Sequence, residues 1–357
     1  MKIRHITQRQ AFLAFLAFFL GNTVILGASE AAGSAGWICA ILAAILAPPL
    51  FLAVASLAKN NPGASFFDVV YKGLGKVGGA VTTVAMVCFS LYSVARDISL
   101  FSMFASGNVM HKASPFVIAL VFSVAAILSV RGGTGTVARW IEISLSAALL
   151  MFSLTFVFSA RGFEPGAVIA SVKAPPEKFV FGTLDFLASA VTGALATTVF
   201  MFGTSPKIKK GRIVAAAVLT AGAILAFVFM WDVALLGANA YELFNFPTFH
   251  AMRAVDSGGF LDRLEILLLF PLTVFGFFSA TVHLLFITSG VGRLFSAADS
   301  RFLSAPTGIL AGFLGLLLFK NQTELAAADD RLTFAIIAVA AGIPVVVFLF
   351  LRLRRKS

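Results

Sequence analysis

Two polar interruptions of apolar segments are the residues of this chain best suited to bind a ligand. The interruptions are Gly21-Asn22-Thr23, within the apolar run 11–28, and Thr192-Gly193-Ala194 in a later run. A helix that is interrupted inside a membrane frees backbone N–H and C=O groups, which can bind the charged ends of a zwitterion. We therefore expect a buried ligand site there, with amides near Thr23, Val24 and Ala194 facing a carboxylate. Close helix packing is the alternative interpretation, because small residues are enriched at such contacts.

Arg96 and Asp97 are the most prominent ionisable residues inside an apolar segment. Charged groups are costly in hydrocarbon, so both side chains should face a cavity or a partner. Adjacent residues lie about 100° apart on a helix and do not neutralise each other fully, so each requires another contact. Candidate partners are Asp185, Glu142 and Glu265. The pair is either a gate or a static ion pair between helices.

Other ionisable residues offer further possibilities. His283 lies inside an apolar segment and could carry a proton near neutral pH, although a hydrogen-bonded histidine within the bundle is the commoner case. Arg139 and Glu142 are spaced for an ion pair on one helix. Asp185, Asp232 and Glu265 fall near the ends of their segments, which favours solvated carboxylates at the membrane surface.

No sequence pattern of an enzyme is found in the chain. A nucleotide-phosphate loop, a His/Glu metal pair and a Gly-x-Ser-x-Gly elbow are all missing from the sequence. We therefore expect no catalytic residue, no metal site and no cofactor.

The composition is that of an integral membrane protein. Of the 357 residues, 59% are hydrophobic and 12% are charged, which is too little polar surface for a soluble globule. The net charge of +11 need not indicate nucleic acid, because Lys and Arg accumulate on cytoplasmic loops. Most of the 27 Lys and Arg residues fall on the side that carries both termini in the assignment below, so both termini are predicted to be cytoplasmic.

A bilayer-spanning helix needs about 20 apolar residues, and ten segments meet or approach that length. The predicted spans are 10–30, 36–58, 79–105, 114–130, 137–159, 180–206, 212–237, 262–291, 305–320 and 333–351. The breaks fall in the first and sixth spans, the matching positions of two five-span halves, as in transporters with inverted repeats.

One all-α membrane domain, 1–357, is therefore expected. It divides into repeats 1–160 and 179–357, joined by an irregular outer link over 161–178. A short amphipathic helix is predicted at 64–75, with Ser65 as its N-cap, and a helical outer cap at 238–261.

Several motifs together resemble the spore germination permease family, the B-type subunits of spore nutrient-germinant receptors. The matching segments are Ile-Thr-Gln-Arg-Gln at 6–10, Leu-Gly at 20–21, Arg96-Asp97 with Phe101, Arg-Trp-Ile-Glu-Ile at 139–143, Pro206 before a basic cluster, Phe-Pro-Thr at 246–248, Ala-Met-Arg at 251–253 and Gly-Phe-Leu-Asp-Arg-Leu-Glu at 259–265. The resemblance covers nearly the whole chain. One departure is Ala194, which stands where the family often has glutamate, so coupling through that carboxylate is in doubt.

The resemblance implies a ten-span fold of the amino acid, polyamine and organocation transporter superfamily, with the inverted repeats of the leucine transporter. It also implies a germinant sensor for a small nutrient, typically an L-amino acid, in the spore inner membrane with both termini on the core side. A larger A-type subunit and a lipoprotein C-type subunit are the implied partners, besides the lipid bilayer. A gradient-driven amino-acid transporter and a scaffold with a vestigial pocket are the alternatives.

Overall fold

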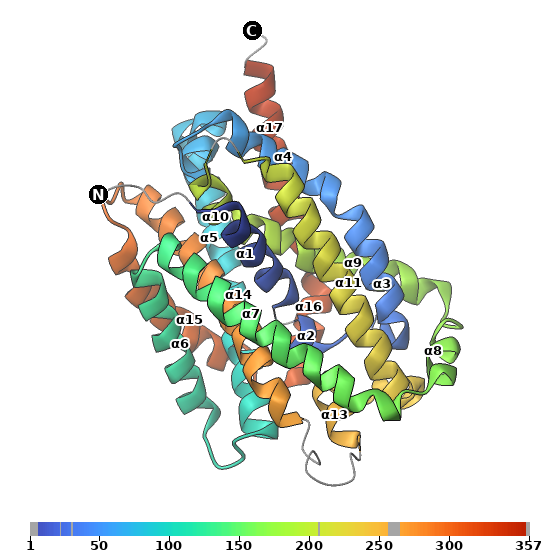
Figure 1. Cartoon of the computed structure of the whole chain (residues 1–357). Helices are drawn as coiled ribbons and strands as arrows, with labels where there is room; N and C mark the ends of the chain where they lie inside the picture. Colours follow the sequence, from blue (N-terminus) through green and yellow to red (C-terminus); the bar gives the residue numbers. More distant parts are fainter. Residues whose placement is uncertain (1–5, 22, 30, 206–207, 256–264, 355–357) are drawn as a thin grey trace.

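The computed structural model describes residues 6–21, 23–29, 31–205, 208–255 and 265–354, and this part of the chain is helical. Long helices lie side by side through the molecule (Figure 1). Their bounds, with the short helices between them, are α1 Gln8–Leu20, α2 Thr23–Leu26, η1 Gly33–Ala35, α3 Gly36–Leu46, α4 Pro48–Asn60, α5 Phe66–Asn108, α6 Pro115–Arg131, α7 Thr134–Ser159, η2 Ala160–Gly162, α8 Pro165–Ser171, α9 Pro176–Ala196, α10 Thr198–Gly203, α11 Lys210–Leu236, α12 Ala238–Tyr241, α13 Pro247–Ala254, α14 Glu265–Leu294, η3 Arg301–Leu303, α15 Ser304–Leu318, α16 Gln322–Ile337, η4 Ala338–Gly342 and α17 Ile343–Arg354.

These helices confirm the prediction of an all-α integral membrane protein. Nine helical segments of the described chain are long and apolar enough to cross a bilayer, and α6, with 17 residues, is the short additional one. The segments α1–α2, α9–α10, α11 and α14 are mostly buried in the bundle, whereas α15 and the last segment are mostly exposed. The interior of the described chain is therefore built around the first, sixth, seventh and eighth spans.

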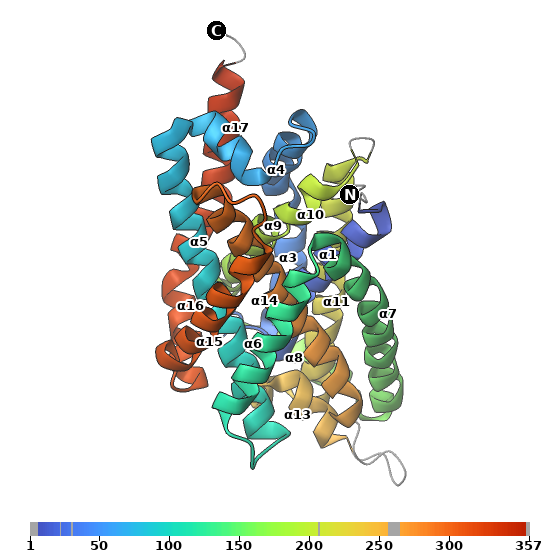
Figure 2. The same cartoon turned by 90° about the vertical axis from the view of Figure 1, so that its left-hand side faces the viewer.

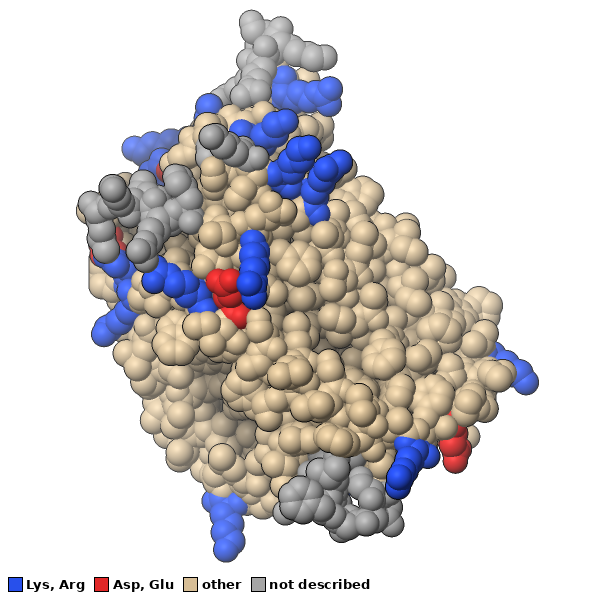
Figure 3. Space-filling view, viewed as in Figure 1, with Lys and Arg blue, Asp and Glu red and all other residues tan. Residues whose placement is uncertain are grey.

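The start of α1 and the end of α17 lie on one side of the molecule, which we call the terminal side (Figures 1 and 2). Most of the Lys and Arg side chains visible in Figure 3 are also near that side. Helices α8 and α13 lie at the other end, which we call the opposite side.

The predicted break in the first span is confirmed at Gly21. Helix α1 ends at Leu20 and α2 begins at Thr23, while Asn22 lies outside the described residues. Gly21 has a φ of 25°, and a Cβ there would lie 2.5 Å from the carbonyl oxygen of Phe18. Only glycine adopts such a backbone at low cost, so this residue ends the helix.

The predicted break at Thr192-Gly193-Ala194 is wrong in position. All three residues continue α9, and the helix is interrupted at Thr197. Gly193 serves packing instead, because a Cβ there would lie 2.6 Å from Cε1 of Phe19 on α1. At the interruption both the amide and the hydroxyl of Thr197 donate to the carbonyl of Gly193, at 3.0 Å and 2.6 Å.

The predicted helix at 64–75 is confirmed as the start of α5. The Ser65 hydroxyl accepts from the amide of Asp68 at 3.1 Å, and the Asp68 carboxylate accepts from the Ser65 amide at 3.0 Å. Gly75, with a φ of 76°, then separates this first part from the long remainder of α5. The outer cap predicted at 238–261 contains α12 and α13, and the link at 161–178 contains α8, so it is not wholly irregular.

The tenth span begins earlier than predicted. Helix α16 starts at Gln322, where the Asn321 side chain accepts from the amide of Glu324 at 2.8 Å and caps the helix. The predicted span, 333–351, left out the first part of α16, because that part contains acidic residues. One of these acidic residues, Asp329, lies within the bundle and contacts Arg96 of α5.

Candidate functional site

A cavity of about 410 Å³ lies beside the break in the first span. Its walls come from α1–α2, α5, α9, α14 and α16, and residues 241–247 contribute on the opposite side. The lining includes Phe18, Phe19, Thr23, Leu26, Ser29, Tyr92, Ser93, Arg96, Asp97, Asp185, Phe186, Ser189, Thr192, Tyr241, Glu242, Ser279, His283, Asp329 and Thr333. The volume suits a small molecule, and the wall combines aromatic, hydroxyl and charged groups.

Asp329 of α16 is the main partner of Arg96. The Nε of Arg96 lies 2.7 Å from both Oδ1 and Oδ2 of Asp329. The three candidate partners named from the sequence are therefore wrong for Arg96. The sequence assignment missed Asp329 because it placed this residue outside the tenth span.

Asp97 is held from the other side of the cavity. It is 3% exposed, and its Oδ2 accepts a hydrogen bond from the Ser279 hydroxyl of α14 at 2.7 Å. Its Oδ1 lies 3.5 Å from a terminal nitrogen of Arg96. A Cβ on Gly21 would lie 3.4 Å from Ser279 Cβ, so this hydrogen bond lies directly behind the helix break.

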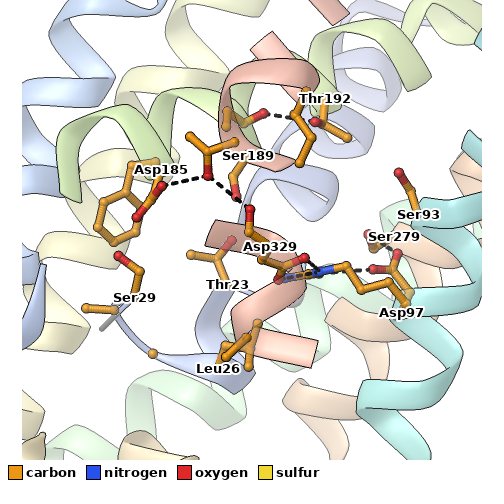
Figure 4. Close-up of a pocket in the computed structure, with 18 of the residues that line it drawn as sticks. Thr23, Leu26, Ser29, Ser93, Asp97, Asp185, Ser189, Thr192, Ser279 and Asp329 are labelled. Atoms are coloured by element: carbon orange, nitrogen blue, oxygen red, sulfur yellow. Dashed lines mark hydrogen bonds and ion pairs between the residues drawn. The ribbon is translucent and has the colours of Figure 1, made fainter. Parts of the chain in front are cut away.

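Asp185 lines the cavity, which corrects the prediction of a solvated carboxylate at the membrane surface. Its Oδ1 accepts a hydrogen bond from the Thr333 hydroxyl of α16 at 2.8 Å. Its Oδ2 is buried and has no hydrogen-bond partner within the described chain. Figure 4 shows Asp185 and Ser29 on one side of the cavity, Asp97 and Ser279 on the other, and Asp329 between them.

The same prediction is wrong for Asp232 and Glu265, which are 0% and 6% exposed. Asp232 Oδ2 lies 2.6 Å from the Thr248 hydroxyl, which also lies 3.2 Å from the carbonyl oxygen of Val24. This contact ties α13 and α11 to α2. Asp232 is interior because Thr248 of α13 packs against the end of α11.

His283 of α14 also lines the cavity and is 2% exposed. Its ring packs edge-on against Phe18, with the ring centroids 5.0 Å apart. Its Nδ1 has no hydrogen-bond partner among the residues that the structure describes. With Asp185 Oδ2 and the Tyr92 hydroxyl, the cavity wall therefore has three buried polar atoms without a hydrogen-bond partner in the described chain.

Several hydrogen bonds converge on Glu242 at the opposite side of the cavity. Its Oε1 accepts from the amide of Ser34 at 2.9 Å and from Lys178 Nζ at 2.9 Å. Burial alone would raise the pKa of this carboxyl, but the hydrogen bonds from Ser34 and Lys178 outweigh burial and lower the pKa. The neighbouring Tyr241 hydroxyl accepts from the Ala28 amide at 3.0 Å. These contacts link the segment after α11 to the end of the first span.

The cavity gathers some predicted site residues and excludes others. Those that line it are Thr23, Thr192, Arg96, Asp97 and His283. Those buried in helix packing are Gly21, Val24, Gly193 and Ala194. The gathered residues come from four different helices, which explains why the sequence did not group them.

The Arg139 and Glu142 motif lies away from the cavity, on α7. Glu142 accepts from Gln10 of α1 at 3.0 Å and lies 3.3 Å from Arg9, whereas Arg139 is exposed. Glu142 therefore joins the start of α1 to α7. Asn22, Pro206 and the motif residues 259–264 lie outside the described residues.

Solved structures with the same fold are transporters. The chain is similar to MhsT, solved in complex with L-phenylalanine, with a TM-score of 0.68, 15% sequence identity, and coverage of 95% of this chain and 88% of that one. It is also similar to Mhp1, a nucleobase-cation-symport-1 family transporter, with a TM-score of 0.65, 13% identity, and coverage of 95% and 76%. At these identities the similarity shows the fold alone, which is that of the leucine transporter, with a discontinuous first and sixth helix.

Sequence relatives are spore germination proteins. The chain is 22% identical over 332 residues to spore germination protein KB of Bacillus subtilis (strain 168), which covers 91% of this chain and 88% of that protein. It is 20% identical over 333 residues to spore germination protein YndE of the same organism, with coverage of 90% and 88%. The family model described as "Spore germination protein" matches residues 5–324. The match spans most of the chain, which therefore belongs to the spore germination permease family.

Proposed function

We propose that this protein is a germinant-sensing membrane subunit, without catalytic activity, that binds a small nutrient of the amino-acid class in the cavity. The observation that carries the proposal is the cavity itself, which lies beside the broken first helix and contains charged groups of both signs. Ionisable groups inside a membrane protein usually mark a binding or transport pathway. Membership of the spore germination permease family supports a role in sensing.

Signalling requires a ligand that binds two conformations with different affinity. The cavity wall offers a means, because it joins elements from both halves of the chain. Arg96 on α5 binds Asp329 on α16, and Asp185 on α9 binds Thr333 on the same helix. A ligand that competes for these groups would move α16 relative to α5 and α9. Partner subunits of the A and C types would then respond to that movement.

The test is ligand binding to purified protein in nanodiscs, alone and with its partner subunits. A panel of amino acids should include at least one that binds saturably, and Thr192→Val should weaken that binding. Thr273→Val is the matched control, because Thr273 is exposed and its hydroxyl makes the same bond to a carbonyl four residues earlier, at 2.7 Å against 2.9 Å for Thr192. If no amino acid bound, or if both variants weakened binding equally, the proposal would be wrong.

We also propose that the terminal side faces the cytoplasm, which is the core in a spore, within the inner membrane. The support is the enrichment of Lys and Arg on that side, as the positive-inside rule requires. A cysteine placed at Ser357 should react with a membrane-impermeant thiol reagent only after the membrane is opened. Labelling in intact cells would show that the terminal side faces outward and would refute this orientation.

A gradient-driven amino-acid transporter is the second candidate. The fold shared with Mhp1, a nucleobase-cation-symport-1 family transporter, favours it. Uptake of the bound amino acid into proteoliposomes, dependent on an imposed ion or proton gradient, would establish transport. Saturable binding without such uptake would favour the sensor.

A further inference from the structure

The cavity contains more acidic than basic side chains. The charged residues in its described lining are Asp97, Asp185, Glu242, Asp329 and Arg96. Lys178 compensates Glu242 at the opposite side, and Arg96 binds Asp329 through two short contacts. Four carboxylates thus stand against two cations, and this excess lies in a region where charge is costly.

Arg96 is not available to balance the carboxylate of a ligand. Its guanidinium is engaged by Asp329 at 2.7 Å and lies 3.5 Å from Asp97. A neutral zwitterion would bring one more carboxylate into the cavity and would leave the acidic excess unchanged. A ligand that carries net positive charge would reduce it.

Two buried acceptor atoms are in place for such a ligand. Asp185 Oδ2 has no hydrogen-bond partner in the described chain, although its Oδ1 is held by Thr333. His283 Nδ1 is likewise without a partner among the described residues, and the side chain is 2% exposed. In the tautomer protonated at Nε2, this atom accepts a hydrogen bond. Buried acceptors without partners are rare and costly, so both favour an occupant that donates.

We infer that the occupant of the cavity is a cation, namely a basic amino acid or a diamine, whose ammonium or guanidinium group binds Asp185. This inference rests on the proposed function, because it names the ligand class of the same cavity. The position of Asp185 supports it, since Thr333 holds this carboxylate on one side and Ser29 lies close to it (Figure 4). The side chain is thus fixed before the ligand arrives, which favours binding.

The test compares three probes on the same purified protein in nanodiscs. L-lysine carries both an extra ammonium and a carboxylate, cadaverine lacks the carboxylate, and L-norleucine lacks the extra ammonium. We expect lysine or cadaverine to bind at least tenfold more tightly than norleucine. Lysine above cadaverine identifies an amino-acid ligand, and the reverse order identifies a diamine.

Asp185→Asn should remove this preference, because asparagine keeps the acceptor for Thr333 and loses the charge. We expect binding of the preferred cation to weaken about tenfold or more, as for loss of a hydrogen bond to a charged group. Asp299→Asn is the control for net charge, since Asp299 is exposed and binds only Arg301 among the interactions described for it. If Asp185→Asn does not fold, Asp185→Glu keeps the charge and should retain selectivity for cations.

Other outcomes would overturn the inference. Norleucine binding as tightly as lysine, with Asp185→Asn unchanged, would leave the proposed sensor intact and refute a cationic ligand. Norleucine binding that requires added sodium or potassium would mean that an inorganic cation balances the cavity, which also refutes it. Failure of all three probes and of the amino-acid panel would refute the proposed function itself.

Discussion

The contact between Arg96 and Asp329 predicts a large effect for the substitution Asp329→Asn. Asparagine has nearly the same shape but removes the negative charge that Arg96 faces at 2.7 Å. Breaking a buried ion pair by removing one partner costs about 3–5 kcal/mol. The two side chains here are 20% and 24% exposed. Solvent therefore screens the remaining charge in part, and we expect Asp329→Asn to lower the free energy of unfolding by about 2–3 kcal/mol.

A double-mutant cycle separates this interaction from general disruption of α16. The double variant Arg96→Gln/Asp329→Asn no longer contains an unpaired cation, so it should lose less stability than the sum of the single variants. The expected coupling is about 1–2 kcal/mol, within the range for residues in direct contact. Asp299→Asn, in an exposed ion pair, should leave stability unchanged within error.

Unfolding in mixed micelles with increasing denaturing detergent, followed by tryptophan fluorescence, measures these differences. Size-exclusion profiles before unfolding establish that each variant is folded. If the losses of the two single variants simply added in the double variant, the ion pair would not hold α16 to α5, and the assignment of Asp329 as the partner of Arg96 would be refuted.

Three further predictions concern the break, the opposite side of the cavity and the start of α1. Gly21→Ala should destabilise the protein more than Gly63→Ala. Both glycines have a positive φ, which costs alanine about 1–2 kcal/mol, but only a Cβ on Gly21 would also meet a carbonyl oxygen, at 2.5 Å. Equal losses in thermal stability would contradict this. Glu242→Gln should lower stability at neutral pH. The lowered pKa of Glu242 means that its contribution is complete above its ordinary value of 4.5 and is lost as the pH falls through the folded-state value. The melting temperatures of wild type and variant should therefore converge as the pH falls below 4.5. A constant difference from pH 7 to pH 3 would exclude this role. Glu142→Gln should cost less than about 1 kcal/mol, because Arg9 is largely exposed, and a larger loss in the same unfolding assay would mean that the contact is shielded from solvent.

Apolar runs, together with residues that end or cap helices, predicted much of the fold correctly. The spans follow from runs of apolar residues, because a bilayer demands helices of a certain length. The break at Gly21 and the cap at Ser65 are local features whose causes lie within a few residues, and both are confirmed. The family motifs are likewise properties of the sequence itself.

The misplaced break at 192–194 and the late start of α16 have different physical causes. A glycine in a helix either ends it or admits a neighbour, and the rings of Phe18 and Phe19 on another helix decide which occurs at Gly193. An acidic residue such as Asp329 indicates, from the sequence alone, a segment outside the membrane. In the structure Arg96 of α5 compensates its charge, so the residue can lie within the bundle. Both outcomes depend on partners far away in the sequence.

The sequence by itself determined that this chain is a membrane protein of ten helical spans with a broken first helix and the motifs of the spore germination permeases. Only the tertiary structure decided which polar residues meet. The cavity joins Thr23, Arg96, Asp185, His283 and Asp329 from five segments far apart in the chain. The physical reason is that bilayer insertion constrains each helix separately, whereas the pairing of buried charges depends on how the helices pack.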